Sequence, residues 1–230
     1  MANALMNARA GNWSWSASRW CWAPAALPRG GSCGEHRYCL IVVLAGDRLR
    51  GGDLDLMIAA RHVTPSAINF MATHGRGLIC LAITPELAKR LGLSLINTGT
   101  HRQTGRPFAR SIEAASGVST GISAADRAHT VTVAIAPGSS AADIHSPGHV
   151  FPLIAQSGGV LARPSACEAS IDLARLAGAG DAAVICSIMR DDGEMARIDD
   201  IGDLLRDHGL AVADIGTLLA RIESAGAERA

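Results

Sequence analysis

Three side chains in the second half of the chain have types that could perform acid–base or nucleophilic chemistry: His149, Cys167 and Ser187. A histidine can gain or lose a proton near neutral pH, which suits a general acid or base. Cys167 falls in the first turn of an expected helix, where the helix dipole could lower the pKa of a thiol. A serine hydroxyl is a poor base without an activating partner. The simpler interpretations are a hydrogen-bonded loop histidine and a buried cysteine.

Three further side chains could hold an anionic or hydroxylated ligand: Arg50, Asp55 and Arg163. A guanidinium can bind a phosphate through two parallel hydrogen bonds. A carboxylate can accept a hydrogen bond from a sugar hydroxyl. The simpler interpretation of Arg163 is a surface salt bridge. For Arg50 and Asp55 it is a solvated loop followed by a helix-capping aspartate.

The composition narrows the class of protein. The 230 residues carry 21 basic and 21 acidic side chains, so the formal charge is zero and nothing favours nucleic acid or an anionic membrane as a partner. The 48% of apolar residues include no run approaching the ~20 residues that a membrane-spanning helix needs. A signal peptide is not expected, because the sequence shows no basic stretch followed by an apolar segment at its start. The six cysteines form no CxxC pair, which favours free thiols and a cytoplasmic location.

The chain divides into three segments. Residues 1–38 hold all four tryptophans without helical or strand periodicity. We interpret them as an irregular, poorly ordered leader; the alternative is an aromatic and basic platform for single-stranded nucleic acid. Residues 39–214 mix strand and helix patterns without strict alternation, and residues 215–230 are expected to form a helical tail. Buried strands are expected at 39–45, 78–83 and 182–189, and helices after Thr64-Pro65, after Thr84-Pro85, and at 165–178 and 199–208. This mixture favours an α+β fold or a three-layer α/β domain.

Several blocks between about residue 39 and residue 212 resemble the 3,4-dihydroxy-2-butanone 4-phosphate synthase family, in family order and spacing. They include Thr120-Gly-Ile-Ser-Ala-Ala-Asp-Arg127, Pro147-Gly-His-Val-Phe-Pro-Leu153 and residues 55–60, 63–65, 68–71, 74–80, 158–160, 171–178, 184–186 and 195–197. The resemblance implies the three-layer α/β sandwich of that family. It also implies a homodimer with active sites near the subunit interface. The family's reaction uses Mg²⁺ and converts ribulose 5-phosphate into 3,4-dihydroxy-2-butanone 4-phosphate and formate.

The resemblance assigns roles to the second half of the site. His149 matches a histidine considered essential in the family, and Arg163 matches a substrate-contacting arginine. Cys167 replaces a substrate-contacting threonine, and Ser187 falls where the family has a catalytic glutamate. We therefore take His149, Cys167 and Ser187 as the candidate catalytic residues.

The resemblance also aligns residues 46–57 with an acidic loop of the family. In the gap-free register, Arg50 and Asp55 match an arginine and a substrate-binding aspartate. Together with Arg163 they are the candidate substrate-binding residues. A second register with two inserted residues would use Arg48, Leu49 and Asp53 instead.

The positions that match the metal ligands of the family carry residues without ligand atoms. Gly51 occupies the position of a glutamate in the family, and Ala166 occupies that of a histidine. We therefore predict that this chain has no metal site and uses no cofactor.

These substitutions leave three interpretations of function open. The preferred one is a diverged homologue that keeps the fold and a sugar-phosphate pocket but has weak or lost synthase activity. A second is a metal-independent lyase or isomerase that uses His149 with Cys167 or Ser187 on another small phosphorylated or polar substrate. The third is a non-catalytic partner that regulates an active synthase subunit.

Overall fold

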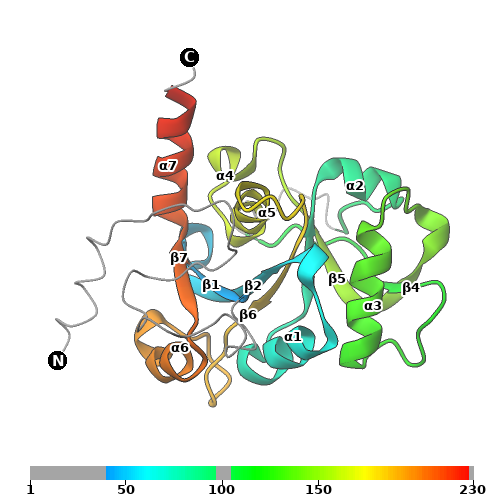
Figure 1. Cartoon of the computed structure of the whole chain (residues 1–230), viewed down its shortest axis with the longest axis horizontal. Coiled ribbons are helices and arrows are strands. Elements are labelled where there is room, and N and C mark those ends of the chain that lie inside the picture. Colours follow the sequence, from blue (N-terminus) through cyan, green and yellow to red (C-terminus); the bar gives the residue numbers. More distant parts are fainter. Residues whose placement is uncertain (1–39, 97–104, 228–230) are drawn as a thin grey trace, which may run out of the picture.

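The apolar runs of the sequence form neighbouring strands of one seven-stranded mixed sheet, seen in a computed structural model (Figure 1). The structure describes residues 40–96 and 105–227, so the expected leader lies outside the described residues. The strands follow the spatial order β4-β5-β3-β6-β2-β1-β7. The pairs β3–β5 and β1–β7 are parallel and the other four pairs are antiparallel. The strand bounds are β1 Val42–Asp47, β2 Asp53–Ala59, β3 Cys80–Ile83, β4 Ile112–Ala114, β5 Ile144–Ile154, β6 Ala183–Ser187 and β7 Ala211–Asp214.

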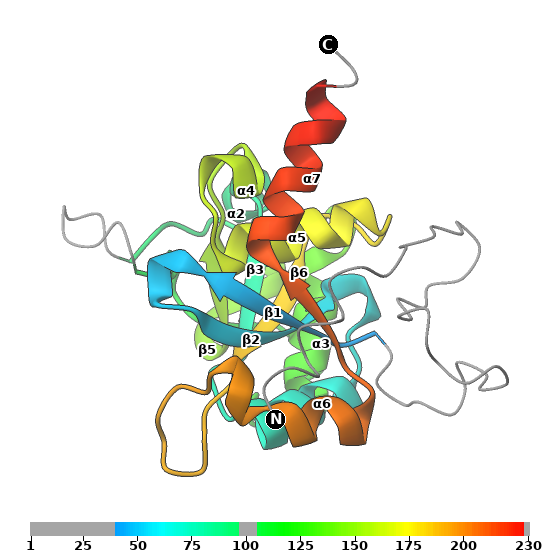
Figure 2. The same ribbon diagram turned by 90° about the vertical axis from the view of Figure 1, so that its left-hand side faces the viewer.

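Helices cover both faces of this sheet. Their bounds are α1 Pro65–Phe70, α2 Pro85–Arg90, α3 Ala124–Ile135, α4 Gly159–Ala162, α5 Ala166–Leu176, α6 Gly202–His208 and α7 Ile215–Ala227. Short 3₁₀ turns occupy Arg48–Arg50, Ala60–His62, Ala141–Asp143 and Ile198–Asp200, and a π turn occupies Met71–Gly75. The end of α7 projects from the body of the domain (Figures 1 and 2). Within the described ranges, no helix has the length and apolar character needed to cross a membrane.

Side-chain alternation along the strands divides the core into two layers. Along β2, Leu54, Leu56 and Ile58 pack in one cluster with α1 and α3. Met57 and Ala59 point to the opposite face, into a second cluster with α4, α5 and α7. The sheet therefore lies between two helical layers, which confirms the predicted α+β fold of the three-layer type.

The helix starts were predicted well because their signals are local. The hydroxyls of Thr64 and Thr84 accept hydrogen bonds from backbone N–H groups three residues later, each ahead of a proline in the first turn. The helix expected at 165–178 starts after Ser165, whose hydroxyl donates to the Glu168 carboxylate and caps no backbone N–H.

Four strands were missed: β2, β4, β5 and β7. β2 and β5 occupy segments that we had interpreted as loops around Asp55 and His149. Asp55 is therefore a fully buried strand residue and not a solvated loop or helix-capping aspartate. The predicted tail forms α7, and its residues Ile215 and Leu218 pack in the second core cluster.

Gly148 of β5 offers a direct test of this sheet. A Cβ atom at this position would overlap the backbone of Ile112 and Glu113 in β4. We predict that Gly148→Ala lowers the free energy of unfolding by about 1–3 kcal/mol, as overpacking does elsewhere. The melting temperature should then fall by roughly 2–12 °C in calorimetry. Gly202→Ala is the matched control, because a Cβ there meets open space. Equal melting temperatures for the two variants would contradict the β4–β5 pairing.

Candidate active site

The candidate site is built around Asp55, a carboxylate buried in the sheet. Antiparallel register places Asp55 of β2 directly opposite Ser187 of β6. Because side chains alternate along a strand, Asp55 lies on the same face as Met57, toward α5. The Ser187 hydroxyl donates to Asp55 Oδ1 at 2.9 Å. A carboxylate that is 0% exposed needs a countercharge as well as hydrogen bonds.

Arg106 supplies that charge, and our sequence analysis missed it. Its Nη2 donates to Asp55 Oδ1 and also to Ser187 Oγ, at 2.6 Å in the second case. Burial disfavours the charged guanidinium, but Asp55 together with Cys80 and Asp47 raises the pKa of Arg106 above its usual range. Arg106 is therefore a permanent cation in the site. Its partners lie 51 and 81 residues away in sequence, so no local pattern could have indicated them.

Arg50, a predicted substrate-binding residue, reaches the same carboxylate from the turn between β1 and β2. Its Nη2 lies 2.8 Å from Asp53, and its Nη1 lies 3.8 Å from Asp55 Oδ2. Arg50 Nη1 and Asp55 Oδ2 are both buried, and neither has a hydrogen-bond partner. A water molecule or a ligand hydroxyl between these two atoms would satisfy their hydrogen-bonding capacity.

Asp47 ties this turn to helix α5. Its carboxylate accepts from the backbone N–H of Leu49 at 3.1 Å and from that of Ala166 at 3.0 Å. Burial raises the pKa of Asp47, while the bond from Ala166 works in the opposite direction. The segment that holds Arg50 is thus fixed to the first turn of the helix that holds Cys167.

Arg163, the third predicted substrate-binding residue, is engaged within the protein. Its Nη2 donates to the Gly105 carbonyl at 2.6 Å, and its Nη1 lies 3.6 Å from Glu168. Glu168 is fully buried and also accepts from the backbone N–H of Gln156 at 2.9 Å. Arg163 therefore connects the segment before Arg106 to α5.

Cys167 is placed where the sequence put it, at the start of α5, but its environment is not that of a nucleophile. The thiol is buried and its sulfur lies 3.8 Å from the Leu153 carbonyl oxygen. Burial raises the pKa of Cys167 well above its usual range, and the nearby Glu168 adds to this effect. Desolvation therefore outweighs any lowering by the helix dipole.

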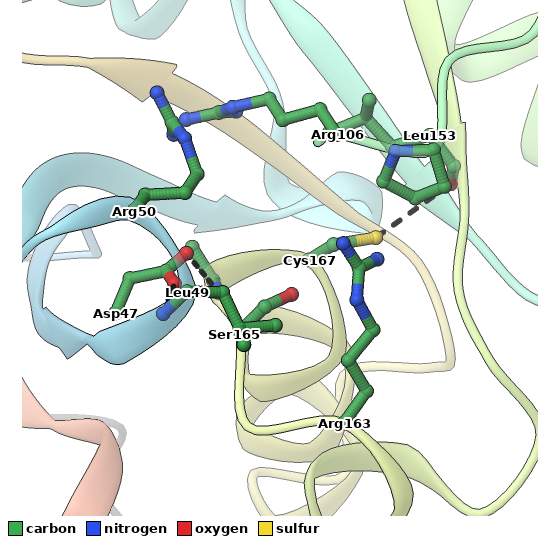
Figure 3. Close-up of a pocket in the computed structure, with 10 residues that line it drawn as sticks. Asp47, Leu49, Arg50, Arg106, Leu153, Arg163, Ser165 and Cys167 are labelled. Carbon is green, nitrogen blue, oxygen red and sulfur yellow. Dashed lines mark hydrogen bonds between the residues drawn. The ribbon is translucent and has the colours of Figure 1, made fainter. Parts of the chain in front are cut away.

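The arginines and Cys167 surround a very small cavity (Figure 3). It measures about 10 Å³ and is lined by Asp47, Leu49, Arg50, Arg106, Pro107, Leu153, Arg163, Ser165, Ala166 and Cys167. That volume holds about one water molecule. Pockets for small-molecule ligands are usually about 300–1,000 Å³. The three guanidiniums and their partners therefore fill most of the space at this point. A second hollow of about 310 Å³ is lined by Gly46, Arg48, Gly51, Gly52, Asp214 and Gly216.

His149 lies outside this cavity lining. It is on β5, four residues before Leu153, which corresponds to roughly 13 Å along a strand. Its Nδ1 is paired with the Glu113 carboxylate of β4, and its side chain is 44% exposed. The cavity thus gathers Cys167 with Arg50 and Arg163, while His149 belongs to a separate pair with Glu113.

The carboxylates of the site are already engaged. Asp55 lies between two arginines, Asp53 pairs with Arg50 and Arg197, and Asp47 accepts two backbone N–H groups. In the described part of the chain, no three His, Cys, Asp or Glu side chains gather where they could hold a metal ion. The oxygen atoms of these carboxylates are therefore directed at arginines and backbone N–H groups.

Comparison with known proteins identifies the class. Residues 35–221 match the profile of the 3,4-dihydroxy-2-butanone 4-phosphate synthase family. The chain is 49% identical, over 185 residues, to the 3,4-dihydroxy-2-butanone 4-phosphate synthase of Pseudomonas aeruginosa, which covers 80% of this chain. A two-domain synthase from A. baumannii has 46% identity and a TM-score of 0.73 over 77% of this chain. This chain belongs to the 3,4-dihydroxy-2-butanone 4-phosphate synthase family, as the sequence predicted.

This chain covers a different share of the length of each relative. It covers 51% of the P. aeruginosa protein and 52% of the two-domain synthase, which is about half of each. It covers 91% of another synthase, solved in complex with two magnesium ions, at 37% identity and a TM-score of 0.75. The prediction that no cofactor is involved is therefore wrong at the level of the family, since the family includes a synthase that binds magnesium.

The buried thiols give a test of the site. Burial raises the pKa of Cys80 to about 11 and that of Cys186 to about 12, and it also raises that of Cys167. We predict that these three cysteines resist iodoacetamide at pH 8 in the native protein and react after unfolding, because the thiolate is the reactive form. Peptide mass spectrometry reads each cysteine separately. Rapid native labelling of Cys167 would contradict the buried site and favour a nucleophile.

Proposed function

We propose that this chain is a diverged homologue of 3,4-dihydroxy-2-butanone 4-phosphate synthase in which the family reaction is weak or lost. Its pocket would still bind a small sugar phosphate through Arg50, Asp55 and Arg163. The observation that carries the proposal is the filling of the pocket by Arg106, which is paired with Asp55 and Ser187 beside a cavity of about 10 Å³. A sugar phosphate would have to displace this internal ion pair.

The chemistry of the family supports the same conclusion. Removing a proton next to a ketone requires a positioned base and stabilisation of the negative charge that develops. Cys167 is buried with a raised pKa, and the Ser187 hydroxyl is held between Asp55 and Arg106. Neither is a free base. His149 lies on β5, where its Nδ1 is paired with the Glu113 carboxylate.

The same positions argue against the metal-independent alternative. That reaction would need His149 beside Cys167 or Ser187. In this chain the length of β5 up to Leu153 separates the histidine from Cys167, and the whole strand β3 lies between β5 and Ser187 of β6. Magnesium belongs in any test of activity, since a relative of 37% identity was solved in complex with two magnesium ions.

Formate release from ribulose 5-phosphate tests the proposal. The purified chain and the P. aeruginosa relative are assayed side by side, with millimolar Mg²⁺ and with a chelator. We predict a rate at least about 100-fold below that of the relative, because one positioned acid–base group alone contributes about 10²–10⁴-fold. A rate within about tenfold of the relative would overturn the proposal.

A further inference from the structure

Arg106 is the most buried of the three guanidiniums around the cavity. Its side chain is 11% exposed, against 15% for Arg163 and 21% for Arg50. It also makes a different kind of contact. Arg50 pairs with Asp53 and lies 3.8 Å from Asp55, and Arg163 lies 3.6 Å from Glu168. Arg106 reaches both polar side chains that the sheet presents at this point, Asp55 and Ser187.

The backbone fixes Arg106 in this position. The residues that follow it run beside β5, where Phe108 forms a bridge with Leu153. The Ala109 N–H donates to the Pro152 carbonyl at 2.9 Å, and the Ile154 N–H donates to the Pro107 carbonyl at 3.0 Å. Arg106 therefore enters the site from a segment attached to the sheet, and its guanidinium lies beside that of Arg50 (Figure 3).

The ion pair takes up the groups that a sugar would use. Asp55 Oδ1 accepts from both Arg106 and Ser187, so it has no room for a hydroxyl of a ligand. The Ser187 hydroxyl is itself used as donor and acceptor. What remains open is Asp55 Oδ2, opposite Arg50, beside a space for about one water.

We infer that Arg106 determines the specificity of this pocket. Its guanidinium holds Asp55 and Ser187, the groups that would contact sugar hydroxyls, and thereby weakens the binding of five-carbon sugar phosphates. This inference rests on the proposed function and names the residue responsible for the loss. The apparent association constant for a sugar phosphate equals that of the open pocket multiplied by the fraction of molecules in which Arg106 has moved away from Asp55.

Calorimetric titration of the full chain with ribulose 5-phosphate, in millimolar Mg²⁺, tests the inference without depending on turnover. Arg106→Ala should bind ribulose 5-phosphate about 10- to 100-fold more tightly than the unaltered chain, which is the range expected when a charged hydrogen bond no longer has to be broken. Unchanged or weaker binding by a folded Arg106→Ala variant would overturn it.

Two matched variants exclude trivial causes. Arg106→Lys keeps a cation and most of the volume beside Asp55, so it should show no such tightening. Arg90→Ala removes an arginine that contacts Ser139 and the Ala136 carbonyl far from the pocket, and it should bind as the unaltered chain does. Tightening in either control would refute a specific role for Arg106.

A further pair of variants keeps the test decisive if Arg106→Ala fails to fold because it leaves the buried Asp55 carboxylate without a countercharge. In an Asp55→Asn background the buried group is neutral, so adding Arg106→Ala should still tighten binding relative to Asp55→Asn alone. No tightening there would count against the inference. The proposed function would be contradicted by a different result, namely synthase turnover of the unaltered chain at the rate of the relative. The two failures are therefore distinguishable.

Discussion

A carboxylate buried in the middle of a β-sheet must be neutralised in place, and the site of this protein is arranged around that requirement. Asp55 is fully buried on β2 and cannot be hydrated. An isolated charge there would cost several kcal/mol or more. Arg106 supplies the countercharge, the Ser187 hydroxyl bridges the two, and Arg50 lies opposite the remaining oxygen.

The neighbouring contacts hold this cluster together. Asp47 fixes the turn that carries Arg50 to the start of α5, and Arg163 joins α5 to the Gly105 carbonyl just before Arg106. The result is a network of hydrogen bonds and ion pairs around the small cavity. The fold is that of the synthase family, at 37% identity to a solved member with a TM-score of 0.75.

Much of the fold could be read from the sequence because its signals are local. The apolar runs of β1, β3 and β6 and the Thr-Pro starts of α1 and α2 are recognisable within a few residues. β2 was missed because Asp53 and Asp55 make it resemble a solvated acidic loop. Only tertiary partners make those charges tolerable in a strand, and such partners leave no local pattern.

The same distinction explains the site. Arg50, Asp55, Arg163 and Cys167 were singled out by their resemblance to family positions, and the structure brings them to one end of the sheet. Arg106 could not be found in that way, because its role depends on contacts 51 and 81 residues away. The expectation for Cys167 followed the helix dipole, whereas the actual environment is set by burial against the sheet.

The most direct measurement is a double-mutant cycle between Asp55 and Arg106 on the free energy of unfolding. The cycle compares Asp55→Asn, Arg106→Met and the double variant with the unaltered chain in urea titrations. If the buried ion pair organises the site, the two substitutions should be coupled by about 1–3 kcal/mol, with the double variant less destabilised than the sum of the single ones. Additivity within about 0.3–0.5 kcal/mol would mean that the two side chains do not depend on each other, and it would contradict an Asp55–Arg106 pair at the centre of this site.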